Sequence, residues 1–122
     1  EPALKRMWYP ARYAGGEETA PLVRRDAEAE VRVCLTALNG KVAELGPHLL
    51  GAQINLADIT LAYWYASVAH LDGMAALDAL AAHVAHVYAR PKLRPFATQA
   101  AEMVAMWESG ADMSALTVSG EK

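Results

Sequence analysis

The residues best placed to carry a defined chemistry in this 122-residue chain are Asn55 and Asp58, three positions apart at the start of an apolar run. A carboxylate such as Asp58 can act as a general acid or base. The same spacing also fits a capping box, in which each side chain accepts a hydrogen bond from the other residue's backbone N–H. We favour this structural role, with Ile54 and Ile59 placed to pack across the cap as a hydrophobic staple.

Polar side chains continue through the same apolar run at helical spacing, so they would form one stripe on a helix. The stripe consists of Thr60, Tyr63, Ser67 and His70. Buried polar groups need hydrogen-bond partners, so the stripe faces either the carbonyls of a neighbouring helix or a wet pocket. The matching pocket candidates near the start of the chain are Trp8, Tyr9, Arg12 and Tyr13.

The remaining candidate ligands and nucleophiles suggest no reactive site. His83 and His86 are three residues apart, but a zinc site needs three or four ligands and no cluster completes the set, so we predict no metal. We place both histidines on the solvent side of an amphipathic helix and assign no role to His48. The single cysteine, Cys34, cannot form an internal disulfide, which fits a reducing cytosol. It lies on an apolar stripe, which favours a core residue over a nucleophile.

The composition favours an all-helical fold. Hydrophobic residues make up 54% of the chain, and alanine, the strongest helix former, about a fifth. Charged residues make up 20% and the net charge is −3, so the basic field that nucleic-acid binders need is absent. The most apolar stretch, residues 56–71, is too short and too polar to span a bilayer. We expect no nucleic-acid partner and no membrane insertion.

Apolar periodicity and Pro/Gly breaks predict a bundle of about five helices over residues 1–110, followed by a polar tail, 111–122. The expected helices cover residues 1–14 (ended or kinked at Pro10), a segment that begins between 19 and 22 and ends at 45, residues 55–71, residues 77–89, and a last segment beginning between 91 and 95. Residues 55–71 are apolar nearly all round, which is typical of a buried central helix. The core stripe expected on the second helix is Ala27, Val31, Cys34, Leu35, Leu38, Val42 and Leu45.

Three stretches resemble the C-terminal helical domain of the glutathione transferase superfamily. Residues 49–59 read LLGAQINLADI and are similar to the family's L-L-G-x-x-x-[ST]-x-A-D-I signature, with Asn55 where Ser or Thr is usual. Residues 77–91 look like the family's helix that leads into an Arg-Pro pair, here Arg90-Pro91. Residues 1–4, EPAL, are similar to part of the first helix of that domain, so we expect that helix to be truncated. The first stretch is specific, and the other two support it.

The resemblance implies a cytoplasmic, dimeric detoxification enzyme that attacks electrophiles with the thiolate of glutathione, its co-substrate. In the family a thioredoxin-like domain comes first, binds glutathione and supplies the catalytic residue. This sequence has no such domain, so we expect residues to precede Glu1, no catalytic residue or bound cofactor here, and an inactive isolated chain. The helical domain would form one wall of the electrophile pocket and part of a homodimer interface.

Two other functions remain open from the sequence, because a fold alone does not fix an activity. Domains similar to this one also serve as non-enzymatic assembly modules in translation factors and aminoacyl-tRNA synthetase complexes. A carrier that uses only the helical pocket would bind apolar dyes without glutathione. A thioredoxin-like pattern upstream of Glu1 would favour the enzyme, and a different domain there would favour the module.

Overall fold

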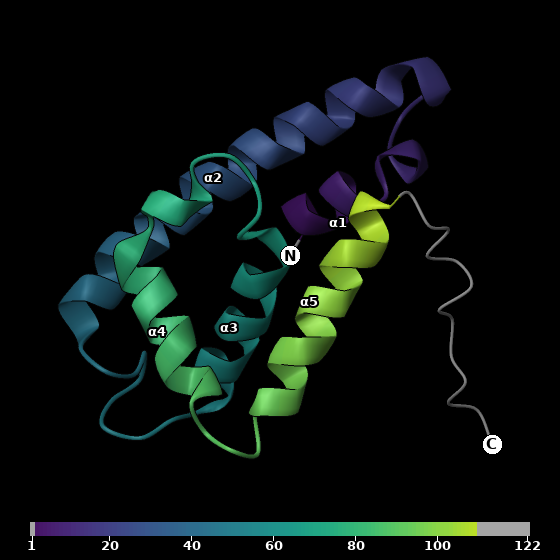
Figure 1. The fold of residues 1–122 in the computed structure, drawn as a ribbon. Helices are drawn as coiled ribbons and strands as arrows, with labels where there is room; N and C mark the ends of the chain where they lie inside the picture. Colours follow the sequence, from purple (N-terminus) through teal and green to yellow (C-terminus); the bar gives the residue numbers. More distant parts are fainter. Residues whose placement is uncertain (1, 110–122) are drawn as a thin grey trace.

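The computed structural model describes residues 2–109, which form five α-helices and, within that range, no β-strand (Figure 1). The helices are α1 (Pro2–Trp8), α2 (Ala20–Leu45), α3 (Leu56–Val68), α4 (Asp78–Tyr88) and α5 (Arg94–Glu108). The predicted all-helical bundle of about five helices is therefore confirmed. The predicted domain end at residue 110 and the tail 111–122 lie outside the described residues.

Proline and glycine set the ends of the helices as their backbone chemistry requires. Helix α1 ends at Trp8, and Pro10 opens a single 3₁₀ turn, Pro10–Arg12. Helix α2 carries Pro21 in its first turn and ends before Gly46, whose φ of 86° is a left-handed value that favours glycine. Gly73 has a φ of 83° in the turn that separates α3 from α4.

Helix α3 occupies the middle of the bundle, as its apolar sequence predicts. It packs against α4 on one side and α5 on the other, while the long α2 packs against α1 and α4 (Figure 1). Ala62, Tyr65 and Val68 bring α3 into the shared core. The helix is central but not fully enclosed, because Leu56 in its first turn is 76% exposed.

The predicted core stripe of α2 is only partly correct. Its buried members are Ala27, Val31, Leu35 and Val42. Cys34, Leu38 and Leu45 are exposed instead, so the expectation that Cys34 is a core residue is wrong. The buried stripe is narrower than the apolar one because, within residues 2–109, this helix packs mainly against α1, α4 and the turns around residues 10–19.

Polar contacts between distant residues tie the helices together. The Asn39 side chain on α2 accepts a hydrogen bond from the backbone N–H of Leu80 at 3.0 Å, in the first turn of α4. The residue before α4, Leu77, does not cap the helix with its side chain. Asn39 on α2 instead accepts one of the first backbone amides of α4, which have no partner within their own helix. The Tyr65 hydroxyl donates to the carbonyl of Met74 at 3.1 Å, which fixes the turn before α4 against α3.

Helix α5 closes the described part of the chain with Pro95 in its first turn. Ala100 on its predicted apolar stripe is fully buried, whereas Phe96 is 47% exposed. Over residues 2–109, no helix combines the length and the apolar character that a bilayer crossing requires.

Candidate functional site

The start of α3 is built as the capping box that the sequence predicts. The Asn55 Oδ1 accepts hydrogen bonds from the backbone N–H of Ala57 at 2.8 Å and of Asp58 at 3.4 Å. In return, Asp58 Oδ2 accepts from the backbone N–H of Asn55 at 2.9 Å. Ile54 and Ile59 are both half-buried, and their contact as a hydrophobic staple stays a prediction.

Asp58 also holds the connector that precedes the helix. Its second oxygen, Oδ1, accepts the backbone N–H of Leu49 at 2.9 Å, nine residues upstream. The side chain is completely buried, so this carboxylate has no surface with which to touch a substrate. The geometry therefore supports the structural role of Asp58 and not the role of a general acid or base. We call this arrangement, Asp58 with the backbone amides of Leu49 and Asn55, the Asp58 clasp.

Two histidines complete the surroundings of this carboxylate, and neither position follows from the sequence analysis. His48 is 4% exposed and His83 is 5% exposed. The Nε2 of His83 lies 3.3 Å from Asp58 Oδ1, and the Nδ1 of His48 lies 3.7 Å from Oδ2. The prediction that His83 faces solvent is wrong, because this side of α4 covers the start of α3. His86 is exposed as predicted, and its ring lies 5.3 Å from that of His48.

Burial lowers the pKa of His83 below its ordinary value of 6.5, because the enclosed site disfavours the charged ring. The Asp58 carboxylate raises the pKa, and positive charge on His48 or His86 lowers it. The backbone carbonyl of Pro47 also raises the pKa of His83, because it favours the protonated ring. The net shift is downward, so His83 is neutral near pH 7.

Metal binding finds no support in this cluster. Among residues 2–109 no group of three or more His, Cys, Asp or Glu side chains has a geometry that could hold a metal ion. Both oxygens of Asp58 already accept backbone amides.

The predicted polar stripe of α3 does not converge on one pocket. Thr60 and His70 are exposed, and His70 lies beyond the last residue of the helix. The Tyr63 hydroxyl donates to Met103 Sδ on α5 at 3.3 Å. Ser67 is fully buried and donates to the carbonyl of Trp64 at 2.7 Å, so it offers no surface to a ligand in the described chain.

Aromatic side chains join the end of α1 to the middle of α3. Trp8 stacks on Trp64 with ring centroids 5.2 Å apart, and Tyr63 meets the same Trp64 ring edge-on at 5.3 Å. Trp8 and Trp64 are partly buried against the core, so both rings contribute to packing. The Arg12 guanidinium lies over the Tyr9 ring, 4.6 Å from its centroid.

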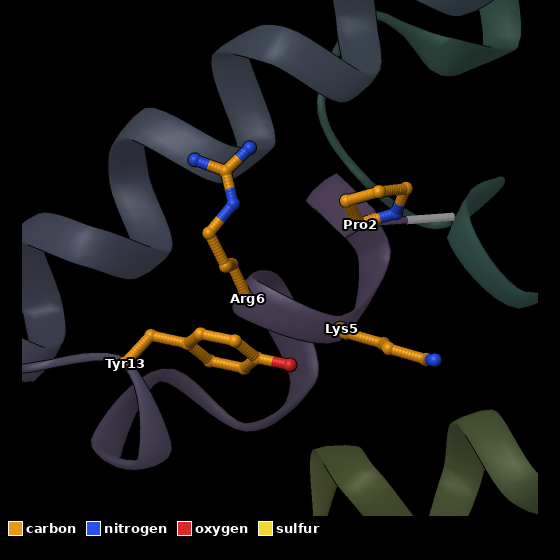
Figure 2. Close-up of a pocket in the computed structure, with 4 residues that line it drawn as sticks. All are labelled: Pro2, Lys5, Arg6 and Tyr13. Atoms are coloured by element: carbon orange, nitrogen blue, oxygen red, sulfur yellow. The ribbon is translucent and has the colours of Figure 1, made fainter.

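Tyr13 is the pocket candidate that borders a hollow. A cavity of about 260 Å³ is lined by Pro2, Lys5, Arg6 and Tyr13 (Figure 2). The Tyr13 hydroxyl points toward α1, whereas the Arg6 side chain extends toward α2, where it pairs with Glu30, and Lys5 extends in another direction (Figure 2). The hollow is open to solvent and mixed in character, because the basic residues Lys5 and Arg6 line it together with the Tyr13 ring and Pro2.

No family model, curated protein or solved structure matches the chain. The motif of residues 49–59 and the geometry of the α3 start and the α1 end are the features that bear on function.

Proposed function

We propose that this chain is the helical domain of a glutathione transferase, which conjugates glutathione to small electrophilic molecules. The support comes from residues 49–59, the stretch that resembles the family signature. Its Asn55 and Asp58 form a complete capping box, and its Leu49 amide binds the same carboxylate. Each of the two side chains accepts the backbone N–H of the other residue. This reciprocal capping explains why an Asn and an Asp lie three residues apart in an otherwise apolar segment.

In this proposal, the chain supplies one wall of the electrophile site, and a thioredoxin-like domain supplies glutathione binding and thiolate stabilisation. The wall would consist of the α1 end and the turn that follows it, where Trp8, Tyr9, Arg12 and Tyr13 lie. Tyr63 borders this region from α3 through Trp64. Ser67 and His70 contribute less, since the first is enclosed and the second lies past the end of α3.

The test uses the complete reading frame that encodes this chain. We expect its product to conjugate glutathione to an aryl halide, and residues 1–122 alone to show no turnover. In the complete product, Tyr13→Ala should raise the KM for the electrophile severalfold, because the ring forms part of the hollow, and leave the KM for glutathione unchanged.

Phe96→Ala is the matched control, since Phe96 is also an exposed aromatic residue but lies on α5, away from the hollow. An unchanged KM in the Tyr13 variant would remove the hollow from the electrophile site. A complete product without any glutathione-dependent turnover would refute the enzymatic proposal and favour the assembly module.

We also propose that the chain associates as a homodimer. Large apolar side chains are exposed on α2, with Val33 at 71% and Leu22 at 51%. Burying such side chains against a partner removes apolar area from water and is favourable. Sedimentation equilibrium should give twice the mass of one chain, and Val33→Glu should give a monomer with unchanged helicity. A wild-type monomer at all concentrations would refute this proposal.

A further inference from the structure

The hollow beside α1 is built from one side of that helix and from a residue that returns to it. Lys5 and Arg6 follow Pro2 by three and four positions, so the three residues share one side of α1. Tyr13 comes back to this side through the 3₁₀ turn, in which its backbone N–H donates to the carbonyl of Pro10 at 3.0 Å. Local backbone hydrogen bonds therefore set the position of Tyr13 in the lining.

The charge around this hollow is positive. Among the described residues that line it, two of four are basic and none is acidic. The segment has the same sign, because residues 2–16 contain Lys5, Arg6 and Arg12 and no Asp or Glu. The net charge of the whole chain is −3, so this segment differs in sign from the rest of the molecule. The hollow therefore attracts anions and repels cations.

Glu30 of α2 offsets part of the charge of Arg6. Its carboxylate pairs with Arg6 Nη2, and both side chains are partly exposed. An ion pair that solvent reaches is weak, and a guanidinium has five N–H donors, of which one nitrogen serves Glu30. A bound anion can therefore share the guanidinium with Glu30 or displace it.

Apolar surface completes the lining. Tyr13 is 52% exposed, so part of its aromatic ring stays in contact with solvent, and Pro2 adds a second apolar ring. A ligand that covers these rings removes apolar area from water. An inorganic ion would use the charge of the hollow alone, whereas an organic anion uses both its charge and its apolar surface.

We propose that this hollow binds a small organic anion, a carboxylate or sulfonate on an apolar body. The anionic group lies toward Lys5 and Arg6, and the body lies against Tyr13 and Pro2 (Figure 2). The role of this ligand as the electrophile rests on the proposed function. In that role, the enzyme prefers electrophiles that carry a negative charge.

Binding without glutathione tests the hollow on the intact chain. Para-nitrobenzoate and para-nitrobenzamide have nearly the same shape and differ in charge, whereas acetate has the charge without the ring. We expect the benzoate to shift the NMR amide signals of Lys5, Arg6 and Tyr13, with a Kd of about 1 mM for a ligand of this size. The amide should bind about fivefold more weakly, the effect of one charge at about 4 Å in water, and added salt should reduce this preference.

Three results of this titration would overturn the proposal. The first is equal affinity for the benzoate and the amide, which would show that the charge of the hollow does not select the ligand. The second is acetate binding as tight as that of the benzoate, which would remove the apolar body. The third is the absence of benzoate-induced shifts at the hollow.

Two variants change the charge of the hollow in opposite directions. Glu30→Gln removes the competing carboxylate, so the affinity for the benzoate should rise about threefold. Lys5→Gln should lower it by a similar factor, and neither variant should change the affinity for the amide. Lys41→Gln is the matched control, because Lys41 is an exposed lysine of α2 that does not line the hollow. Weaker benzoate binding in Glu30→Gln, or equal losses in the two lysine variants, would contradict the proposal.

Turnover by the complete product separates this proposal from the proposed function. The product should use a chloronitrobenzoate with a lower KM than the matching chloronitrobenzamide. Equal KM values would overturn the preference for anions and leave the transferase standing. Turnover of neither compound would refute the transferase, whereas a preference of the chain for the benzoate would still support a site for organic anions.

Discussion

Replacing Asp58 by alanine is expected to lower the free energy of unfolding by about 4 kcal/mol, the sum of two lost backbone hydrogen bonds in a buried site. The carboxylate accepts the amides of Leu49 and Asn55, and no other acceptor is available to either within the clasp. Domains of this size have total stabilities of about 5 to 15 kcal/mol, so the variant would be barely folded. Urea unfolding followed by circular dichroism measures the difference.

Two control variants separate the clasp from a general effect of charge. Asp26→Ala removes a carboxylate whose side chain is 73% exposed, so its stability should change by less than about 0.5 kcal/mol. Asn55→Ser should also be nearly neutral, because a serine hydroxyl caps a helix as well as an asparagine amide does. A melt of Asp58→Ala that matches that of Asp26→Ala would contradict the clasp.

Leu80→Ala should cost about 3 kcal/mol, the second-largest effect that we expect. Leu80 is fully buried in α4 and belongs to the core shared by α2, α3 and α4. Truncation would leave a cavity where three helices meet, and the helices cannot all close over it. The backbone amide of residue 80 keeps its bond to Asn39, so the loss is confined to packing. Denaturant titration would show a lower midpoint with an unchanged slope.

Leu56→Ala is the matched comparison, because the same atoms are removed from a side chain that is 76% exposed. Its stability should change by less than about 0.5 kcal/mol, since little apolar area returns to water. Equal losses in the two leucine variants would mean that Leu80 does not lie in the core.

Local signals predicted the helices well because each boundary depends on a few adjacent residues. Gly46 and Pro47 end α2, Pro10 ends the first segment, and the Asn55/Asp58 pair starts α3 where the sequence places it. These features act through backbone geometry and hydrogen bonds over three or four positions, so periodicity and composition are sufficient to find them.

The surroundings of Asp58 could not be predicted in the same way. His48 and His83 are 35 positions apart in the printed sequence, and only the packing of α4 on α3 brings both to one carboxylate. Asn39 meets Leu80 across 41 positions for the same reason. The burial of His83 did have a local signal. Leu80 and Val87 lie on the same helix, at helical spacing from His83, and both are buried.

The number of helices that pack against α2 explains why the predictions of buried residues on this helix were partly wrong. An apolar stripe shows which residues can be buried, but the number of neighbouring helices decides how wide the buried strip becomes. With α1 and α4 as its helical neighbours, α2 leaves Cys34, Leu38 and Leu45 in solvent. The sequence of α2 alone carries no information about that number.

The Asp58 clasp joins residues that are only three and nine positions apart. Loops this short lose little chain entropy on closing, so the same contacts can recur transiently in the denatured ensemble. Residual order there reduces the surface that unfolding newly exposes to solvent. The denaturant m-value, which scales with that surface, should therefore be larger for a chain without the clasp than for the wild type.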